Sequence, residues 1–262
     1  MFASRTFTIS ALLGATLVSA QLSLSQNCTR ALTTIATNPD ANACLTPSPL
    51  LTLLTSSSSS SSVIEPINNW LTSLCAAPAC SNATIAAIVV NATQGCAEDL
   101  SGLGLGVDGV DAPALTTIVQ RYYPTVRRAV CLKDGNTNCV TQTLTNIEGI
   151  LGPLSIPNII TLATTGAAGN VTLPTNVTCT TCIKAEYNLL NTEAPGLFGA
   201  EETLEDQCGA EFIDGNNPSG ITQSASDTTA GADTRGSGAL RQTISKALSG
   251  VAAIAGVLVL AA

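Results

Sequence analysis

The residue types best suited to chemistry in this chain are cysteine and the carboxylates, because its 262 residues include 10 cysteines, 18 acidic residues and no histidine. Without histidine, the chain cannot form a Ser-His-Asp triad, a Cys-His pair, or a zinc or haem site with a histidine ligand. The remaining candidates are a carboxylate cluster, a dithiol spacing and a glycine-rich loop.

The carboxylate cluster lies between positions 201 and 211. A pair of carboxylates can hydrolyse a glycoside, one residue acting as general acid and the other as base or nucleophile. Glu201, Glu202 and Glu205 are therefore the candidates for a carboxylate-dependent hydrolase. Sugar-binding sites also use aromatic platforms, and the chain has one tryptophan and three tyrosines. We therefore interpret the cluster as a solvated helix face.

The spacing Cys179-Thr-Thr-Cys182 matches a redox dithiol, which needs a lowered thiol pKa and usually a strand before the helix. No strand is evident there, so we interpret both residues as structural cysteines on one helix face with two different partners. The stretch from Gly104 to Gly109 matches the dinucleotide fingerprint by letter, but lacks its strand and its later acidic residue. We interpret it as an interhelical loop, and Asp108 and Asp111 are too few to hold calcium. We expect no catalytic residue, cofactor or metal.

An even number of cysteines in an oxidising compartment predicts five disulfides. Helix geometry separates Cys80 from Cys96 by about 24 Å, too far for a bridge. Cys28 can pair with Cys44 through the turn at residues 38–40, and Cys131 with Cys139 through the turn at residues 134–136, but the sequence leaves the full connectivity open. The ten positions are Cys28, Cys44, Cys75, Cys80, Cys96, Cys131, Cys139, Cys179, Cys182 and Cys208.

Helical periodicity dominates the middle of the chain. Leu115, Ile118 and Val119 begin one apolar face, after Asp111 as the cap and Pro113 in the first turn. Further helices are predicted over 63–75, after Ser81, over 140–151 and over 179–190. Convincing alternating strands are scarce. The fold class is therefore mostly α, a single disulfide-stapled helical domain followed by a disordered stalk rich in serine, threonine and glycine.

The two ends carry processing signals. Arg5, an apolar run and Val18-Ser19-Ala20 predict a secretory signal peptide cleaved after Ala20. A terminal apolar run from Ala247, behind a polar spacer and small residues, predicts attachment of a glycosylphosphatidylinositol (GPI) anchor at Ser237, with Gly236 and Gly238 as alternatives. The predicted parts are a signal peptide (1–20), an ectodomain (21–213), a stalk (214–237) and a GPI-attachment propeptide (238–262). The seven serines from Ser56 to Ser62 predict a flexible loop.

The surface chemistry fits a secreted protein. The net charge of −8 argues against nucleic acid as a partner, because phosphate would be repelled. Five Asn-x-Ser/Thr sequons are candidate N-glycosylation sites. They begin at Asn27, Asn82, Asn91, Asn170 and Asn176.

The cysteine framework resembles that of a group of secreted, cysteine-rich fungal proteins, chiefly from mushrooms and their relatives. The resemblance covers about residues 25–220 and rests on residues 66–82 with Trp70, on Gly95-Cys96, on Ala129-Val130-Cys131 and on Cys179–Cys182. It implies a signal peptide, about ten cysteines, a Ser/Thr-rich tail and a GPI anchor, and no catalytic residues. The cysteine count and spacing differ from those of the eight-cysteine fungal haem-scavenging domain.

These observations lead us to expect a non-enzymatic cell-surface or cell-wall glycoprotein with a structural or adhesive role. It would lie outside the cell, bound by its lipid to the outer leaflet of the plasma membrane or to the cell wall, with cell-wall glycans or a small apolar ligand as partners. The alternative is an extracellular lipid- or sterol-binding helical module, since small disulfide-rich helical bundles can enclose apolar cavities. A carboxylate-dependent hydrolase is the third interpretation.

Overall fold

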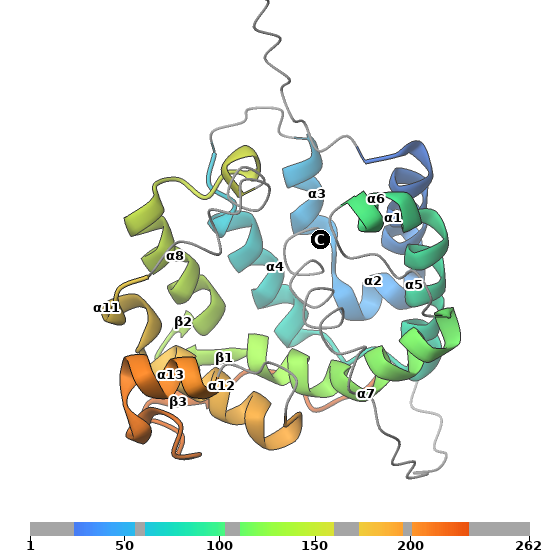
Figure 1. The fold of residues 1–262 in the computed structure, drawn as a ribbon. Coiled ribbons are helices and arrows are strands. Elements are labelled where there is room, and N and C mark those ends of the chain that lie inside the picture. Colours follow the sequence, from blue (N-terminus) through green and yellow to red (C-terminus); the bar gives the residue numbers. More distant parts are fainter. Residues whose placement is uncertain (1–23, 56–60, 103–110, 160–172, 196–200, 231–262) are drawn as a thin grey trace, which may run out of the picture.

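The computed structural model describes residues 24–55, 61–102, 111–159, 173–195 and 201–230 (Figure 1). The expected signal peptide, most of the serine run, the glycine-rich loop, Asn170 and the GPI signal lie outside these residues. The described part is mostly helical, as predicted, and its strands are short. The helices are α1 (Gln26–Thr37), α2 (Pro39–Leu45), α3 (Ser48–Thr55), α4 (Ile64–Ala76), α5 (Asn82–Gly95), α6 (Ala97–Gly102), α7 (Ala112–Val130), α8 (Cys139–Leu151), α11 (Thr175–Thr178), α12 (Thr181–Glu193), α13 (Glu201–Cys208) and the 3-10 helix η1 (Ala210–Phe212); the strands are β1 (Leu132–Asp134), β2 (Thr137–Asn138) and β3 (Ile221–Gln223).

Side-chain caps fix the starts of two of the predicted helices, α7 and α5. The Asp111 carboxylate accepts the N–H of Ala114 at 2.9 Å and begins α7. The Ser81 hydroxyl accepts the N–H of Thr84 at 3.1 Å and begins α5. Each cap satisfies a backbone donor that has no partner within the helix. The helices predicted over 63–75, 140–151 and 179–190 are confirmed as α4, α8 and α12.

Among the described residues, an apolar core of seven buried side chains lies between α3, α4 and the segment that follows α8. Trp70 is buried there, and its indole Nε1 donates to the carbonyl of Leu45 at 2.8 Å. This bond satisfies the polar end of the side chain while its rings fill the core. The buried members of the cluster are Leu50, Val63, Ile67, Trp70, Leu71, Leu74 and Leu154.

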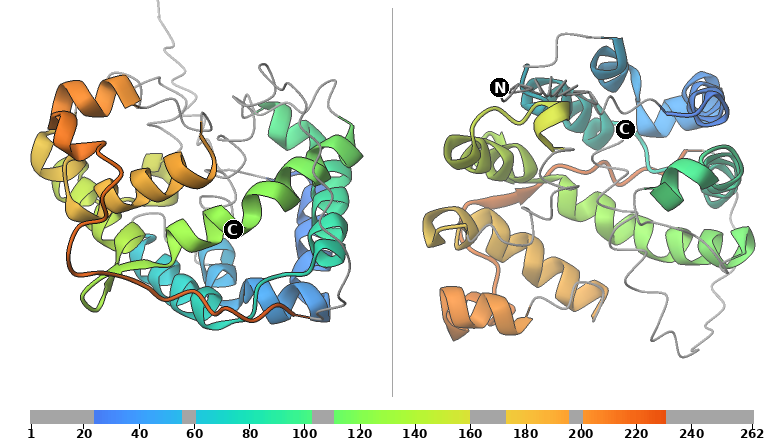
Figure 2. Two further views of the ribbon diagram at one scale, coloured as in Figure 1. Left: turned by 90° about the horizontal axis from the view of Figure 1, so that it is seen from below. Right: turned by 45° about the horizontal axis from the view of Figure 1, so that its top comes forward.

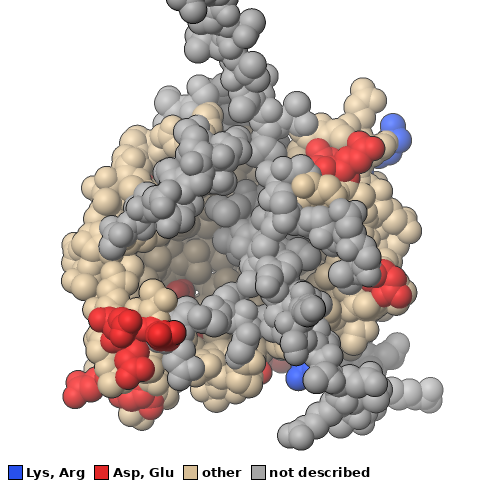
Figure 3. Space-filling view, in the orientation of Figure 1, with Lys and Arg blue, Asp and Glu red and all other residues tan. Residues whose placement is uncertain are grey.

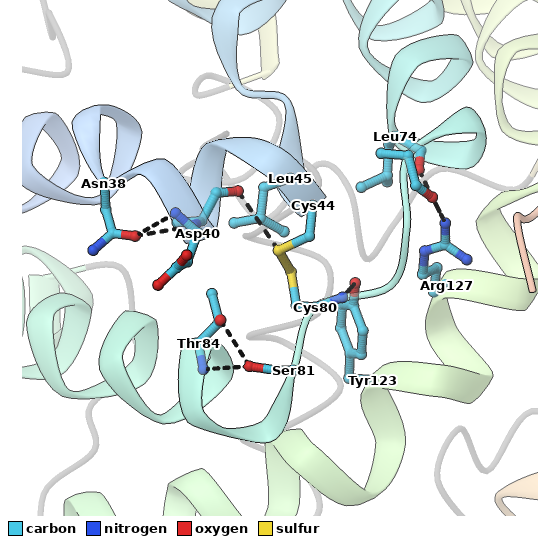
Figure 4. The surroundings of a disulfide bond; sticks show 12 residues. Asn38, Asp40, Cys44, Leu45, Leu74, Cys80, Ser81, Thr84, Tyr123 and Arg127 are labelled. Atoms are coloured by element: carbon cyan, nitrogen blue, oxygen red, sulfur yellow. Dashed lines mark hydrogen bonds between the residues drawn. A yellow bond between two sulfur atoms is a disulfide. The ribbon is translucent and has the colours of Figure 1, made fainter. Parts of the chain in front are cut away.

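A second core joins α2, α5 and α7 around the disulfide between Cys44 and Cys80 (Figure 4). The N–H of Cys80 donates to the Tyr123 hydroxyl at 2.9 Å. The Asn38 side chain accepts from the N–H groups of Asp40 and Ala41 and so begins α2. The expected turn at residues 38–40 is therefore the junction of two helices.

All ten cysteines are paired, and none is free. The five pairs are Cys28–Cys96, Cys44–Cys80, Cys75–Cys131, Cys139–Cys182 and Cys179–Cys208. The separation of Cys80 from Cys96 is confirmed. Cys179 and Cys182 do have different partners, as predicted. The expected shared helix face is wrong, because Cys179 directly follows the end of α11 whereas Cys182 lies in α12.

The two suggested short-range pairs, Cys28–Cys44 and Cys131–Cys139, are wrong. Cys28 faces the end of α5, where α1 approaches Gly95 so closely that an added Cβ would lie 2.2 Å from the Cβ of Ala31. Cys131 does not pair with Cys139 because β1 and β2 form a hairpin that pairs Lys133 with Asn138. Continuing this register sets Leu132 opposite Cys139, and neighbours along a strand point to opposite faces.

Part of the segment expected to be a stalk (214–237) is packed against the domain. Residues 220–230, which we call the C-terminal strap, lie against the domain, and β3 pairs antiparallel with β1. The sheet order is β2-β1-β3. Figure 2 shows the strap crossing the molecule to the end where α2 and α5 lie. Its backbone groups hold it in place, so its small polar composition gave no indication of this packing.

One buried cation helps to tie these parts together. The Arg127 guanidinium donates to the carbonyls of Leu74 and Ala77 at the end of α4 and to the carbonyl of Ser226 in the strap. A positive charge at a helix C-terminus also complements the helix dipole. Arg127 therefore joins α4, α7 and the C-terminal strap.

Candidate functional site

The carboxylates proposed for hydrolysis lie on one exposed helix. Glu202, Glu205 and Asp206 are exposed on α13, which also carries Glu201. Figure 3 shows acidic side chains gathered at this corner of the molecule. A carboxyl group keeps its proton at neutral pH, as a general acid must, when its site is enclosed. Glu202, Glu205 and Asp206 are exposed rather than enclosed, so their arrangement matches the solvated face.

The two cysteines of the Cys-x-x-Cys spacing form two separate bridges, as the structural interpretation expected. Cys182 bridges to Cys139 at the start of α8, and Cys179 bridges to Cys208 at the end of α13. Two sulfurs that are bound to different partners do not form the reversible dithiol–disulfide couple of a Cys-x-x-Cys redox site. In this fold Cys182 ties α12 to the start of α8, and Cys179, between α11 and α12, ties that junction to the end of α13.

The described residues contain no group of three or more cysteine or acidic side chains that could hold a metal ion. Asp111, considered for calcium, is the cap of α7. Asp108 and the stretch from Gly104 to Gly109 lie outside the described residues.

The sequon asparagines of the described residues lie on helices. Asn27, Asn82 and Asn176 are exposed, at the starts of α1 and α5 and within α11. Asn91 is half-buried, and its Nδ2 donates to the carbonyl of Ala87 at 2.8 Å. The amide nitrogen that would carry a glycan is therefore already engaged at Asn91, whereas the three exposed positions face solvent.

Surface recesses in the described part of the chain include a shallow groove of about 490 Å³ along α1. Every lining residue except Leu24 is of a polar type, and the hydroxyls of Thr33 and Thr37 donate back to carbonyls of the same helix. The groove is open to solvent, unlike the enclosed apolar cavity expected of a lipid- or sterol-binding module. Its lining residues are Leu24, Gln26, Thr29, Arg30, Thr33, Thr34 and Thr37.

One carboxyl that the sequence did not single out is held in an unusual environment. Glu186 on α12 is partly exposed as a residue, but its Oε1 is fully enclosed, and no described residue hydrogen-bonds to that oxygen. Burial raises the pKa of Glu186 to about 8. The group therefore keeps its proton at neutral pH and can act as a hydrogen-bond donor.

The position of Glu186 follows from a disulfide. It lies one helical turn after Cys182, whose partner Cys139 begins α8. Thr143 lies one turn after Cys139, and its Oγ1 is also enclosed without a hydrogen-bond partner among the described residues. The bridge thus holds two helices together close to two unsatisfied polar atoms. In the sequence, the only indication of this enclosed carboxyl was that Glu186 follows Cys182 by four residues and lies between Ala185 and Tyr187.

Two other carboxylates stabilise local structure in their charged form. The Ser25 hydroxyl and N–H both donate to Asp99, and these bonds lower the pKa of Asp99. The N–H of Asn216 donates to Asp214 and lowers its pKa, with a smaller effect from Lys184. The bonds to Asp99 join Ser25, the cap of α1, to α6, and the bond to Asp214 closes a turn.

Comparison with known proteins found no matching family model, no similar curated protein and no similar solved structure. Among the described residues, no helix is long and apolar enough to cross a membrane. The five disulfides indicate a protein of the secretory pathway or the extracellular space.

Proposed function

We propose that this protein is a non-enzymatic, GPI-anchored surface glycoprotein with a structural or adhesive role. The observation that carries the proposal is a fully disulfide-paired body that exposes three sequon asparagines, Asn27, Asn82 and Asn176. Covalent cross-links suit a domain that must persist outside the cell, and exposed sequons suit a surface covered by glycans.

The sequence of the C-terminus supplies the mode of attachment. Small residues around Ser237, a polar spacer and a terminal apolar run form the three parts of a GPI signal. The apolar run from Ala247 to Ala262 has 16 residues and no charge, whereas a spanning helix needs about 20. A glycolipid at Ser237 would bury its acyl chains in the outer leaflet and leave the body outside the cell.

Enzymatic release tests the anchor. Phosphatidylinositol-specific phospholipase C should release the protein from intact cells, with acid hydrolysis as a second treatment for anchors that resist the enzyme. Replacing Gly236, Ser237 and Gly238 together with bulky residues should block transfer to the glycolipid and retain the chain in the endoplasmic reticulum. Surface protein that neither treatment releases, or normal release of the triple variant, would contradict the proposal.

The adhesive role has its own test. The released protein should bind isolated cell walls, and the same protein after reduction and alkylation should not, because the disulfides hold its binding surface together. Equal retention of both forms would show that binding does not depend on the folded body.

A further inference from the structure

The C-terminal strap is bound to the domain along its whole length. At its start, β3 pairs with β1 over Ile221–Gln223. In its middle, Ser224 and Ser226 donate backbone hydrogen bonds to the domain. At its end, the N–H of Ala79 donates to Thr228, and the N–H of Ala230 donates to Ala79, both at 2.7 Å. The strap is therefore part of the folded body.

The middle of the strap lies across a disulfide. The N–H and hydroxyl of Ser224 both donate to the carbonyl of Cys131, at 3.0 and 2.6 Å. The N–H of Ser226 donates to the carbonyl of Cys75 at 2.8 Å. Cys75 and Cys131 are bridged to each other. The Arg127 guanidinium also donates to the carbonyl of Ser226 at 3.0 Å, so the strap is attached to a covalently cross-linked part of the domain.

The strap ends at a defined corner of the molecule. Ala230 packs against the cluster that contains Cys44 and Cys80, where α2 meets the start of α5. Ser237 is the seventh residue after Ala230. Even a fully extended chain of seven residues spans at most about 24 Å. A lipid attached at Ser237 therefore lies close to this corner.

The chemistry of this corner permits a close approach to a bilayer. Asp40 is the only charged residue in α2, and α5 contains none. A surface with few charges loses little hydration and experiences little repulsion beside anionic headgroups. Asn82 is exposed at the start of α5, so a glycan there would lie in the gap between body and lipid.

We propose that the C-terminal strap orients the domain on the cell surface, so that the corner formed by α2 and the start of α5 faces the bilayer. The opposite corner, which carries α13, then points outward with its acidic side chains (Figures 2 and 3). This inference rests on the proposed GPI attachment. It goes further by identifying the surface that remains available to partners outside the cell.

Energy transfer on intact cells tests the orientation. A dye-bearing amino acid is placed at Asn42 on α2 or at Thr203 on α13, both exposed, in the full-length protein, with an acceptor dye in the outer leaflet. We expect greater transfer from Asn42 than from Thr203, and loss of both signals after phospholipase C treatment. Equal transfer, or greater transfer from Thr203, in protein that phospholipase C still releases would overturn the orientation. If neither the enzyme nor acid released the protein, the result would instead contradict the proposed GPI anchor.

A second variant tests the strap itself. Ser226→Pro removes the N–H that donates to Cys75 and should loosen the strap, which lengthens the free tether to as much as about 60 Å if it detaches from Gly220 onward. The ratio of Asn42 to Thr203 transfer should then fall toward one. Asp227→Ala is the matched control, because it changes an exposed strap side chain and keeps every backbone donor. An unchanged ratio in Ser226→Pro would show that the strap does not set the orientation.

Discussion

Replacement of Glu186 by glutamine should stabilise the protein, with an effect that depends on pH. In the unfolded chain this carboxyl titrates near pH 4.5, whereas burial raises its pKa to about 8 in the folded protein. Between these values the unfolded chain loses the proton that the folded protein keeps. The free energy of unfolding therefore falls as pH rises from 4.5 to 8, and the effect of Glu186 is absent below 4.5.

The magnitude follows from the same two pKa values. Each unit of pH in this window weakens the folded state by at most about 1.4 kcal/mol, which gives a ceiling of about 3 kcal/mol at pH 7. Because Glu186 is partly exposed to solvent, we expect about 1–3 kcal/mol. Glutamine has nearly the same shape and carries no titrating proton. Glu186→Gln should therefore raise the free energy of unfolding by this amount at pH 7 and leave it unchanged at pH 4.

Urea unfolding of the secreted form at pH 4, 6 and 8, with its disulfides intact, measures the difference. Glu202→Gln on the exposed face of α13 is the matched control and should change the stability by only a few tenths of a kcal/mol. If Glu186→Gln differs from the parent protein by the same amount at pH 4 and pH 8, the enclosed carboxyl does not hold its proton, and the reasoning is refuted.

Three further predictions concern the frame and its surface. Arg127→Met should lower the free energy of unfolding by about 3–5 kcal/mol, because two buried carbonyls and one partly buried carbonyl lose their donor. Arg128→Met, which removes an exposed ion pair with Glu193, should cost less than about 1 kcal/mol. Asn82→Gln should remove one N-glycan from the protein, visible as a single step in gel mobility that glycosidase treatment abolishes; unchanged mobility would show that this sequon is not used. Alkylation of the denatured, unreduced protein should label no cysteine, and labelling of several would contradict the five bridges.

The helices could be predicted because their signals are local. Asp111 lies directly before an apolar face that repeats every three to four residues, so the cap and the period agree on the start of α7. The same agreement holds for Ser81 and α5. Such signals do not depend on how the helices pack against one another.

The remaining features depend on contacts between distant segments. The partner of Cys28 is decided by the packing of α1 against α5 at Gly95, and the partner of Cys131 by the register of a hairpin. The strap is held by its backbone, so its composition resembles that of a linker. The enclosure of Glu186 Oε1 is a property of the folded chain, and a single glutamate in the sequence gives no periodic signal of it.

The C-terminal peptide of the surface protein tests the proposed attachment most directly. Protein collected from the cell surface is cleaved before Asp233, and the released fragment is analysed by mass spectrometry. The account predicts a peptide from Asp233 to Ser237 that carries an ethanolamine-linked glycan, with Gly236 or Gly238 as the alternative last residue. A peptide that contains Val257 to Ala262 in the surface protein would contradict it and would show that the apolar tail is retained.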